Sequence, residues 1–329
     1  MSEGYPDIRL RRLRQTPQMR RMLDRPFPGP ERFLWPVFVV PGSGVCEPID
    51  AMPGQFRYSV DQLIEALKPV ANMGISGVLI FGLAEDSYKD GTGTHAFDPK
   101  GTVQEAVRAI REAFPRLLVF TDVCVCAYTS HGHCGPLTAA GVVNNDASNV
   151  VLAKVAVSHA EAGAQGVAPS AMMDGQVAAI RGALDAAELT DTILMSYSTK
   201  FASAMYGPFR DAEKSAPQSG DRQGYQASCR DLGTALRESD LDEAEGADIL
   251  MVKPSLFYLD VLTRLRERTD LPIAAYNVSG EYAMLIATAD RGWGDLYPMV
   301  RESIIALDRA GADIIISYWA NQYEKVLAP

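Results

Sequence analysis

The chain has 329 residues, 47% of them hydrophobic, and its 31 basic and 41 acidic residues give a net charge of −10. That length and apolar content suffice for a complete core in one large or two average domains. The acidic balance argues against general nucleic-acid binding, and no apolar run approaches the roughly 18 residues of a membrane span, so we expect a protein that acts on a small molecule.

Residues 1–33 form a separate basic arm, with seven arginines between Arg9 and Arg25. On an acidic protein such an arm could bind nucleic acid or wrap an acidic neighbouring subunit, and the overall charge favours the subunit. The arm lacks the continuous apolar stretch of a signal peptide. We therefore expect a cytoplasmic protein whose cysteines are reduced.

From residue 34 to 329, short aliphatic runs alternate with longer amphipathic ones. The expected strands are Trp35–Val40, Gly77–Phe81, Leu117–Asp122, Gly166–Pro169, Thr192–Tyr197, Asp248–Val252, Pro272–Val278 and Asp313–Tyr318. The expected helices are Ser59–Asn72, Thr102–Ala113, Ser148–Ala162, Gly175–Ala187, Leu232–Glu245, Leu256–Arg268, Glu281–Ala289 and Leu296–Ala310. Gly74, Gly163, Gly246 and Gly311 close four of these helices, as C-terminal caps do.

Eight strands that alternate with helices, and that are too apolar to have a solvated face, predict a parallel sheet buried on both sides. At this length and strand number we expect a (β/α)₈ barrel, the TIM-barrel fold. A doubly wound sheet shows similar alternation, but no Gly-x-Gly-x-x-Gly motif follows the first strand. Functional side chains of a barrel lie where its strands end, and polar residues occupy those positions. They are Asp122, Ser170, Lys200, Lys253, Ser279 and Tyr318.

Residues 122–135 hold three of the five cysteines of the chain. Cys124 and Cys126 are two residues apart, and Cys134 can fold back to them through a turn at Gly132. Three thiolates suit Zn²⁺ and leave one coordination position for water or substrate. Buried free thiols and a disulfide are the alternatives, of which a reducing compartment disfavours the disulfide.

Two of the four histidines, His131 and His133, lie in the same loop. Either could be a ligand. We interpret both as hydrogen-bonding neighbours of the metal site instead.

Lys253 ends the otherwise apolar run Ile249-Leu-Met-Val-Lys. Burial lowers the pKa of a lysine and frees its amine to attack carbonyl groups, and a second lysine nearby lowers it further. Lys200 follows the preceding expected strand, Thr192–Tyr197, and would be that neighbour around the barrel. A salt bridge at the barrel rim is the structural alternative for either lysine, but two lysines opposite a metal loop favour Schiff-base chemistry.

Residues 201–231 form a long connection that is rich in glycine, proline and charge. Connections of this length in a compact domain are usually functional or disordered. Arg210, Arg222 and Gln226 could reach over the barrel mouth, so we predict a lid that binds an anionic substrate and excludes water. A flexible surface insertion is the alternative.

Several motifs occur in a fixed order over nearly the whole chain. They are Asp122-Val-Cys-Val-Cys, His131-Gly-His-Cys-Gly, Val167-Ala-Pro-Ser, Lys200-Phe-Ala-Ser, Tyr206-Gly-Pro-Phe-Arg-Asp, Gly220-Asp-Arg, Met251-Val-Lys-Pro and Tyr276-Asn-Val-Ser-Gly-Glu-Tyr-Ala-Met. Together they resemble the porphobilinogen synthase family, also called 5-aminolevulinate dehydratase.

The resemblance implies that two molecules of 5-aminolevulinate condense into porphobilinogen, with loss of two waters, in tetrapyrrole (heme) biosynthesis. It implies Schiff bases on Lys253 and Lys200 and a catalytic Zn²⁺ on the three cysteines. The other implied contacts to substrate are Asp122 and Ser170 for one amino group, Ser279 and Tyr318 for one carboxylate, Arg210, Arg222 and Gln226 for the other, and Tyr206 in the lid motif.

The family assembles as homo-octamers through an N-terminal arm, so the resemblance implies that the basic arm packs against another subunit. Glu238 matches a glutamate that supports an allosteric Mg²⁺ in some members.

The chain departs from the family pattern at Ala171, where aspartate is usual, at Gln176, where a basic residue is usual, and in the lid after Gln226. The loss of a carboxylate beside the metal loop would remove a proton acceptor or an orienting hydrogen bond. Two alternatives therefore stay open. One is a paralogue that uses the same amine and zinc chemistry on a different keto acid or amine, and the other is a catalytically weak zinc protein kept for assembly or regulation.

Overall fold

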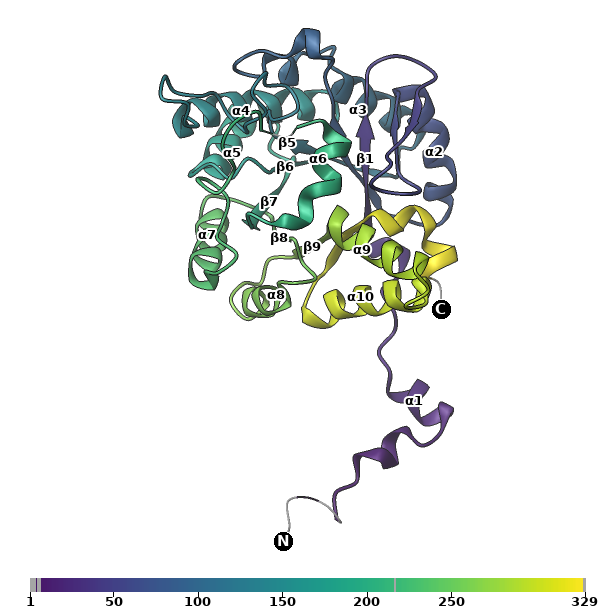
Figure 1. Ribbon diagram of the computed structural model, residues 1–329. Coiled ribbons are helices and arrows are strands. Elements are labelled where there is room, and N and C mark those ends of the chain that lie inside the picture. Colours follow the sequence, from purple (N-terminus) through teal and green to yellow (C-terminus); the bar gives the residue numbers. More distant parts are fainter. Residues whose placement is uncertain (1–3, 5–6, 216, 328–329) are drawn as a thin grey trace.

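The computed structural model describes residues 4, 7–215 and 217–327. Parallel strands close into a barrel that helices surround (Figure 1). The barrel strands are β1 (Phe33–Val39), β4 (Gly77–Gly82), β5 (Leu118–Val123), β6 (Gly166–Pro169), β7 (Ile193–Lys200), β8 (Ile249–Lys253), β9 (Ile273–Asn277) and β10 (Ile314–Ser317). Each strand pairs with its neighbour in chain order, and β10 pairs with β1 to close the ring. The predicted (β/α)₈ TIM barrel is therefore confirmed.

The helices lie between these strands along the chain. They are α2 (Val60–Asn72), α3 (Thr102–Ala113), α4 (Asn145–Glu161), α5 (Gln176–Ala186), α7 (Leu232–Ala244), α8 (Leu259–Arg266), α9 (Ser279–Asp290) and α10 (Leu296–Ala310). All eight predicted helices and all eight predicted strands are present. The bounds of Thr102–Ala113, Leu296–Ala310 and Gly166–Pro169 are as predicted, and the other elements have shifted ends. The four predicted capping glycines have positive φ angles between 82° and 114°, which glycine adopts without strain.

Two of the helices begin at a different residue than predicted, and the local contacts explain why. The helix α4 begins at Asn145, because the Asn144 side chain accepts a hydrogen bond from the backbone N–H of Ala147 and caps the helix earlier. The helix α8 begins at Leu259, because the N–H of Leu256 donates to the buried carboxylate of Glu281 at 2.9 Å and fixes the preceding residues in a turn.

A small hairpin after β1 was not predicted. The strand β3 (Phe56–Tyr58) pairs in parallel with the end of β1 and antiparallel with β2 (Cys46–Pro48). The hairpin extends the sheet beside the barrel mouth, and its Arg57 points its guanidinium group toward the 201–231 segment.

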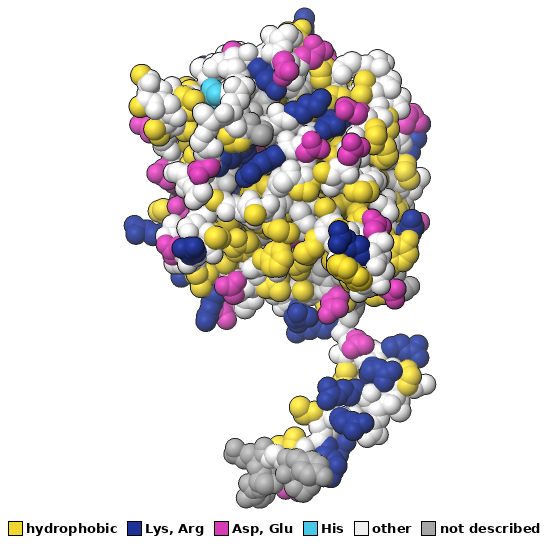
Figure 2. All heavy atoms as spheres, in the orientation of Figure 1, with side chains coloured by type: hydrophobic (Ala, Val, Ile, Leu, Met, Phe, Trp, Pro, Cys, Tyr) yellow, Lys and Arg dark blue, Asp and Glu magenta, His cyan; other side chains and the backbone are white. Residues whose placement is uncertain are grey.

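The N-terminal arm leaves the barrel and extends away from it with α1 (Pro17–Leu23) (Figure 1). Arginines cover much of its surface (Figure 2). Leu10 and Met22 are 69% and 79% exposed, so the arm carries apolar side chains that the barrel of the same chain does not cover. The first barrel strand begins at Phe33, close to the predicted boundary.

The 201–231 segment, called the lid segment below, crosses the carboxyl ends of the strands. It contains a 3₁₀ turn (Ala204–Tyr206) and the short helix α6 (Gly207–Glu213) (Figure 1). Its backbone approaches Gly280 so closely that a Cβ atom there would lie 2.4 Å from the carbonyl oxygen of Met205. Only glycine permits this approach.

Across the described ranges of the chain, no helix has both the length and the apolar character that crossing a bilayer requires.

Candidate active site

Lys253, the last residue of β8, is buried in an aromatic environment and is 3% exposed. Its Nζ lies 4.2 Å from the ring centre of Tyr276 and 4.8 Å from those of Tyr197 and Phe209. Burial, followed by the positive charge of Lys200, lowers the pKa of Lys253 to about 7. A substantial share of this amine is therefore neutral near neutral pH.

Lys200 ends β7 directly opposite Lys253, because the two residues are register partners in the parallel pairing of β7 and β8. The Nζ of Lys200 donates to the carbonyl oxygen of Ser170 at 2.5 Å. It also lies 5.5 Å from the ring centre of Tyr197, the ring that Lys253 contacts from 4.8 Å. Both amines thus enter the same compartment at the barrel mouth.

Asp122 lies at the end of β5 and faces the lysines. Burial, and next the charge of Glu213, raise the pKa of Asp122 to about 7, while Lys200 and Lys253 act in the opposite direction. One of its carboxylate oxygens is buried without a hydrogen-bond partner among the described residues. Such a carboxyl group can gain or lose a proton near neutral pH.

The three predicted cysteines come together. The sulfur atoms of Cys124, Cys126 and Cys134 all lie within 4.8 Å of one another and all three side chains are buried, with 3.4 Å between the first two. Contacts with Cys124 and then Cys126 hold the pKa of Cys134 well below its usual range. Contact with Cys124 raises the pKa of Cys126. The cluster favours one thiolate, and three sulfur donors at this spacing fit a borderline cation such as Zn²⁺.

The histidines of this loop have hydrogen-bond partners and do not join the described sulfur cluster. The Nε2 of His131 lies 3.2 Å from the carbonyl oxygen of Gly91. The ring nitrogens of His133 lie 3.2 Å from the Tyr225 hydroxyl and 3.0 Å from the carbonyl oxygen of Ser219. This confirms the interpretation of both as hydrogen-bonding neighbours.

Glu213 is a site residue that sequence reasoning missed. It ends α6 in the lid segment, is 4% exposed, and accepts hydrogen bonds from the Ser215 hydroxyl at 2.6 Å and the Cys126 thiol at 3.6 Å. Glutamate in a charged loop carries no signal of burial, so only the fold shows that this carboxylate contacts Cys126.

Arg222 connects the lid segment to the loop that carries the cysteines. It is 6% exposed, and its Nη2 donates to the carbonyl oxygens of Gly132 at 3.1 Å and Ser215 at 2.6 Å. Burial acts against its charge, but the nearby Cys134 and Cys126 raise the pKa of Arg222. The lid segment is therefore closed on the cysteine loop.

Three predicted anion-binding residues have unpaired polar atoms. Within the part of the chain that the structure describes, the Nε atoms of Arg210 and Arg222 and both amide atoms of Gln226 are buried without hydrogen-bond partners. Buried polar groups are rarely left unpaired, so these atoms are free to receive a polar ligand.

Ser279 and Tyr318 are the residues predicted for the second carboxylate. Ser279 opens α9, and its hydroxyl accepts from the N–H of Phe209 at 3.0 Å. The hydroxyl of Tyr318 lies 3.2 Å from that of Tyr276. The Tyr206 hydroxyl donates to the carbonyl oxygen of Lys253 at 3.0 Å, so Tyr206 holds the strand end that carries the lysine.

Two of the three departures named above, Ala171 and Gln176, are buried. Ala171 is fully buried next to Ser170. Gln176 is 2% exposed, and its side chain bonds the N–H of Met173 and the carbonyl oxygen of Pro169. Gln176 therefore fixes the turn after β6 and is not available to substrate.

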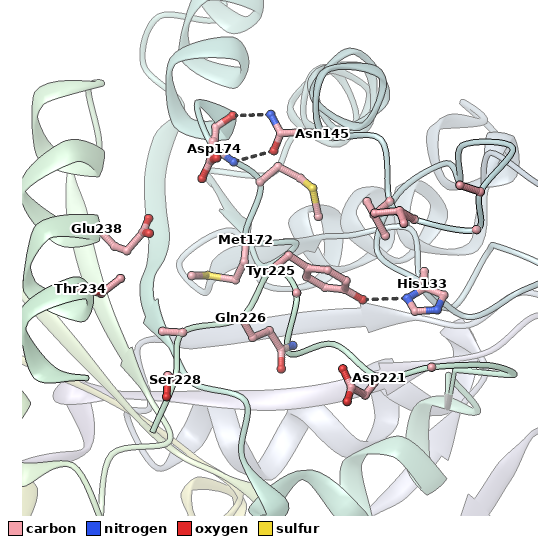
Figure 3. Close-up of a pocket in the computed structure, with 18 of the residues that line it drawn as sticks. His133, Asn145, Met172, Asp174, Asp221, Tyr225, Gln226, Ser228, Thr234 and Glu238 are labelled. Carbon is pink, nitrogen blue, oxygen red and sulfur yellow. Dashed lines mark hydrogen bonds between the residues drawn. The ribbon is translucent and has the colours of Figure 1, made fainter. Parts of the chain in front are cut away.

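Glu238 lies away from the lysines. It lines a cavity of about 770 Å³ between the lid segment and α7, together with Tyr225, Gln226 and Asp174 (Figure 3). Burial and then the charge of Asp174 raise the pKa of Glu238. The exposed Cys229 lies in the lid segment and does not join the described cysteine cluster.

Known proteins resemble this chain in sequence and in structure. The family model described as Delta-aminolevulinic acid dehydratase matches residues 7–326. A protein of that name from Synechococcus elongatus is 48% identical over 327 residues, covering 98% of this chain and 100% of the relative. One from Methanothermobacter thermautotrophicus is 51% identical over 318 residues, covering 96% of each. The crystal structure of delta-aminolevulinic acid dehydratase (porphobilinogen synthase) from Toxoplasma gondii, in complex with the reaction product porphobilinogen, superposes with a TM-score of 0.94 at 40% identity, covering 97% of this chain and 91% of that one.

Proposed function

Because the chain belongs to the delta-aminolevulinic acid dehydratase family, we propose that it condenses two molecules of 5-aminolevulinate into porphobilinogen with the release of two waters. As a member of this family it is a dehydratase, a hydro-lyase. The observation that carries the proposal is the pair of register partners Lys200 and Lys253, whose amines face one ring, Tyr197, at the barrel mouth.

Lys253 supplies a nucleophile. Its neutral amine attacks the ketone carbon of one 5-aminolevulinate, and the carbonyl oxygen leaves as water when the C=N bond of a Schiff base forms. Lys200 does the same with the second molecule. Two amines on adjacent strand ends hold the two substrates side by side, which replaces a collision in solution by a reaction between bound neighbours.

Asp122 transfers protons in this scheme. With a pKa of about 7 it can accept a proton from a substrate ammonium group and return one to a departing oxygen. Ser170 accepts a hydrogen bond from Lys200 through its carbonyl oxygen, and its side chain hydrogen-bonds to Asp122. Together they orient one amino group.

Cys124, Cys126 and Cys134 would hold Zn²⁺, and their close, buried sulfurs fit that ion. When bound, Zn²⁺ supplies Lewis-acid polarisation of a substrate oxygen or amine. Arg222 offsets the negative charge of the thiolates, because it lies against both the cysteine loop and the lid segment.

The two substrate carboxylates would bind at two separate sites. Arg210, Arg222 and Gln226 offer buried polar atoms without partners and would hold one carboxylate. Ser279, at the positive end of α9, would hold the other together with Tyr318, since helix N-termini favour anions. The lid segment then excludes water from the reacting groups.

The oligomeric state of the protein and its regulation by a metal ion stay predictions. The exposed apolar side chains of the arm favour packing against another subunit, with a homo-octamer as the expected state. An allosteric Mg²⁺ at Glu238 and a cytoplasmic location likewise stay predictions.

The deciding experiment incubates the purified protein with 5-aminolevulinate and Zn²⁺ and detects the pyrrole product with a chromogenic reagent. Borohydride should trap a substrate adduct on Lys253. Adduct formation without pyrrole would favour the diverged paralogue, which the identities of 48% and 51% over nearly the whole chain disfavour. No adduct at all would favour a catalytically weak zinc protein.

A further inference from the structure

One buried carboxylate joins three strand ends of the barrel. Glu281, in the first turn of α9, is 0% exposed. One of its oxygens accepts from the N–H of Leu256 at 2.9 Å, in the segment after β8. The other accepts from the N–H of Val278 at 2.9 Å and from the side-chain amide of Asn277 at 3.0 Å, at the end of β9. The hydroxyl of Ser317, which ends β10, donates to the amide oxygen of Asn277 at 2.9 Å, so the network reaches a third strand.

Each of these strand ends carries a residue of the proposed site. Lys253 is the last residue of β8, Ser279 is the first residue of α9, and Tyr318 directly follows β10. The amine proposed to attack a ketone and the two hydroxyl groups proposed to hold a carboxylate are thus connected through Glu281.

Helix capping alone does not explain Glu281. A glutamate at the third position of a helix often accepts from the backbone N–H of the N-cap residue, and the contact with Val278 is of this kind. The contact with Leu256 is different, because Leu256 belongs to another segment. Burial raises the pKa of Glu281 to about 7, while the hydrogen bonds from Leu256 and Val278 act in the opposite direction. A carboxylate is costly to bury unless such bonds compensate, so Glu281 serves contacts between segments as well as the helix end.

Tyr276 lies between the two ends of the proposed keto-acid site. The Nζ of Lys253 lies 4.2 Å from the centre of its ring, and its hydroxyl lies 3.2 Å from that of Tyr318. The amine and the Tyr318 hydroxyl are therefore placed along one rigid aromatic side chain. Tyr276 precedes Asn277 on β9, so the strand that the Glu281 network holds also carries this ring. A keto acid that reaches both ends has to match this length.

We propose that Glu281 is a positioning residue that sets the length of the keto acid accepted at Lys253. By holding the segment after β8 against the start of α9, it fixes the distance from the amine to Ser279 and Tyr318. The site then selects acids with two methylene groups between ketone and carboxylate, as in 5-aminolevulinate. This role rests on the proposed function, in which Lys253 attacks the ketone and the two hydroxyl groups hold the carboxylate.

The test measures adduct formation on Lys253 of the full-length protein with two acids, 4-oxopentanoate and 5-oxohexanoate, which is one methylene longer. The amine nitrogen bonds to the ketone carbon and the oxygen leaves as water. Borohydride then adds hydride to the carbon of the C=N bond while a solvent proton goes to nitrogen. Peptide mass spectrometry separates the adduct on Lys253 from one on Lys200. We expect half-saturation of the wild type at a concentration about 10–200-fold lower for the shorter acid, the discrimination typical of one methylene.

Glu281→Gln keeps the shape of the side chain but replaces one accepting oxygen by an NH₂ group, which cannot accept a hydrogen bond. We expect the preference for the shorter acid to fall about tenfold, as the loss of one or two buried hydrogen bonds implies. Asp290→Asn removes a negative charge from an exposed side chain of the same helix and should keep the preference. Ser317→Ala removes the outer hydrogen bond to Asn277 and should lower the preference by a smaller factor.

The ratio between the two acids separates positioning from a merely structural role. If Glu281→Gln weakened adduct formation equally with both acids and kept the preference, Glu281 would only stabilise the fold and the proposal would be overturned. Where Glu281→Gln does not fold, an unchanged preference in Ser317→Ala has the same meaning. A wild type that binds both acids equally well would overturn the proposal and leave the proposed function intact. The absence of any adduct on Lys253 would overturn the proposed function and this role together.

Discussion

The amine of Lys253 lies 4.8 Å from the ring centre of Phe209, so a phenyl group of the lid segment covers a lysine of the barrel. Phe209 also contacts Phe38 and Phe81 with ring-centre distances of 5.7 Å and 5.1 Å. The closed lid thereby completes the apolar surroundings of the lysine. Because desolvation is the main cause of the low pKa of Lys253, lid closure and amine chemistry are physically linked.

The first prediction concerns the pH dependence of activity. Schiff-base formation needs the neutral amine, and the pKa of Lys253 is lowered to about 7. Below that pH the amine is protonated, so kcat/KM should fall about tenfold for each pH unit on the acid side and level off above it. Asp122 titrates in the same range, so the measured midpoint belongs to the coupled groups. A profile without an acid limb near neutral pH would contradict this assignment.

The second prediction concerns stability. The pKa of Lys253 is lowered from its ordinary value of 10.5 to about 7 in the folded protein, so between these pH values the unfolded chain binds more protons than the folded one. The buried lysine therefore costs most stability below pH 7, and the cost fades as pH rises toward 10.5. Lys253→Met should abolish activity yet raise the free energy of unfolding by at least about 1 kcal/mol at pH 6, with a smaller gain at pH 9. Denaturant unfolding at both pH values checks this.

Much of this site was predictable from the sequence. The apolar strand ending in Lys253, the lysine ending the strand before it, and the cysteine spacing each indicate their chemistry, because a (β/α)₈ barrel brings strand ends to one face. The register pairing of Lys200 with Lys253 depends in addition on a register shift between Ser196 and Thr199, which the topology alone does not fix.

The contributions of the lid segment were not predictable in the same way. Glu213, Phe209 and Arg57 act through contacts between segments that are distant in sequence, and neither local pattern nor residue type reveals them. Arg57 illustrates this, since it lies on a three-residue strand that no periodicity predicted. Two of its partners are backbone carbonyls 154 and 155 positions away.

The third prediction concerns the metal. A chelator should abolish pyrrole formation and Zn²⁺ should restore it. Cys134→Ser should lose both activity and bound metal, whereas Cys229→Ser, which changes an exposed thiol of the lid segment, should keep both. Metal binding displaces thiol protons, so the affinity should fall as pH falls. Full turnover of metal-free protein would exclude the catalytic role of the cysteines.

The fourth prediction concerns the connection between lid and metal loop. Arg222→Lys keeps the charge but cannot reproduce two hydrogen bonds from one guanidinium nitrogen to Gly132 and Ser215. We expect kcat/KM to fall about 10–100-fold, as losing one to two charged hydrogen bonds implies, and protease cleavage in the lid segment to become faster. Arg230→Lys, at an exposed position of the same segment, is the control. Equal cleavage rates for both variants would show that Arg222 does not hold the lid.

The fifth prediction tests whether the lid tunes Lys253. Phe209→Ala removes the ring that covers the amine and lets water approach it, which should raise the pKa of Lys253 toward its ordinary value. The acid limb of kcat/KM should therefore move to higher pH by about one unit, a size typical of partial resolvation, and activity at pH 7 should fall while activity at pH 9 is largely kept. Phe257→Ala removes a phenyl group that is 59% exposed and should leave the profile in place. If Phe209→Ala lowered the rate equally at every pH, the ring would serve only to position the substrate, and the low pKa of the lysine would have to come from the barrel alone.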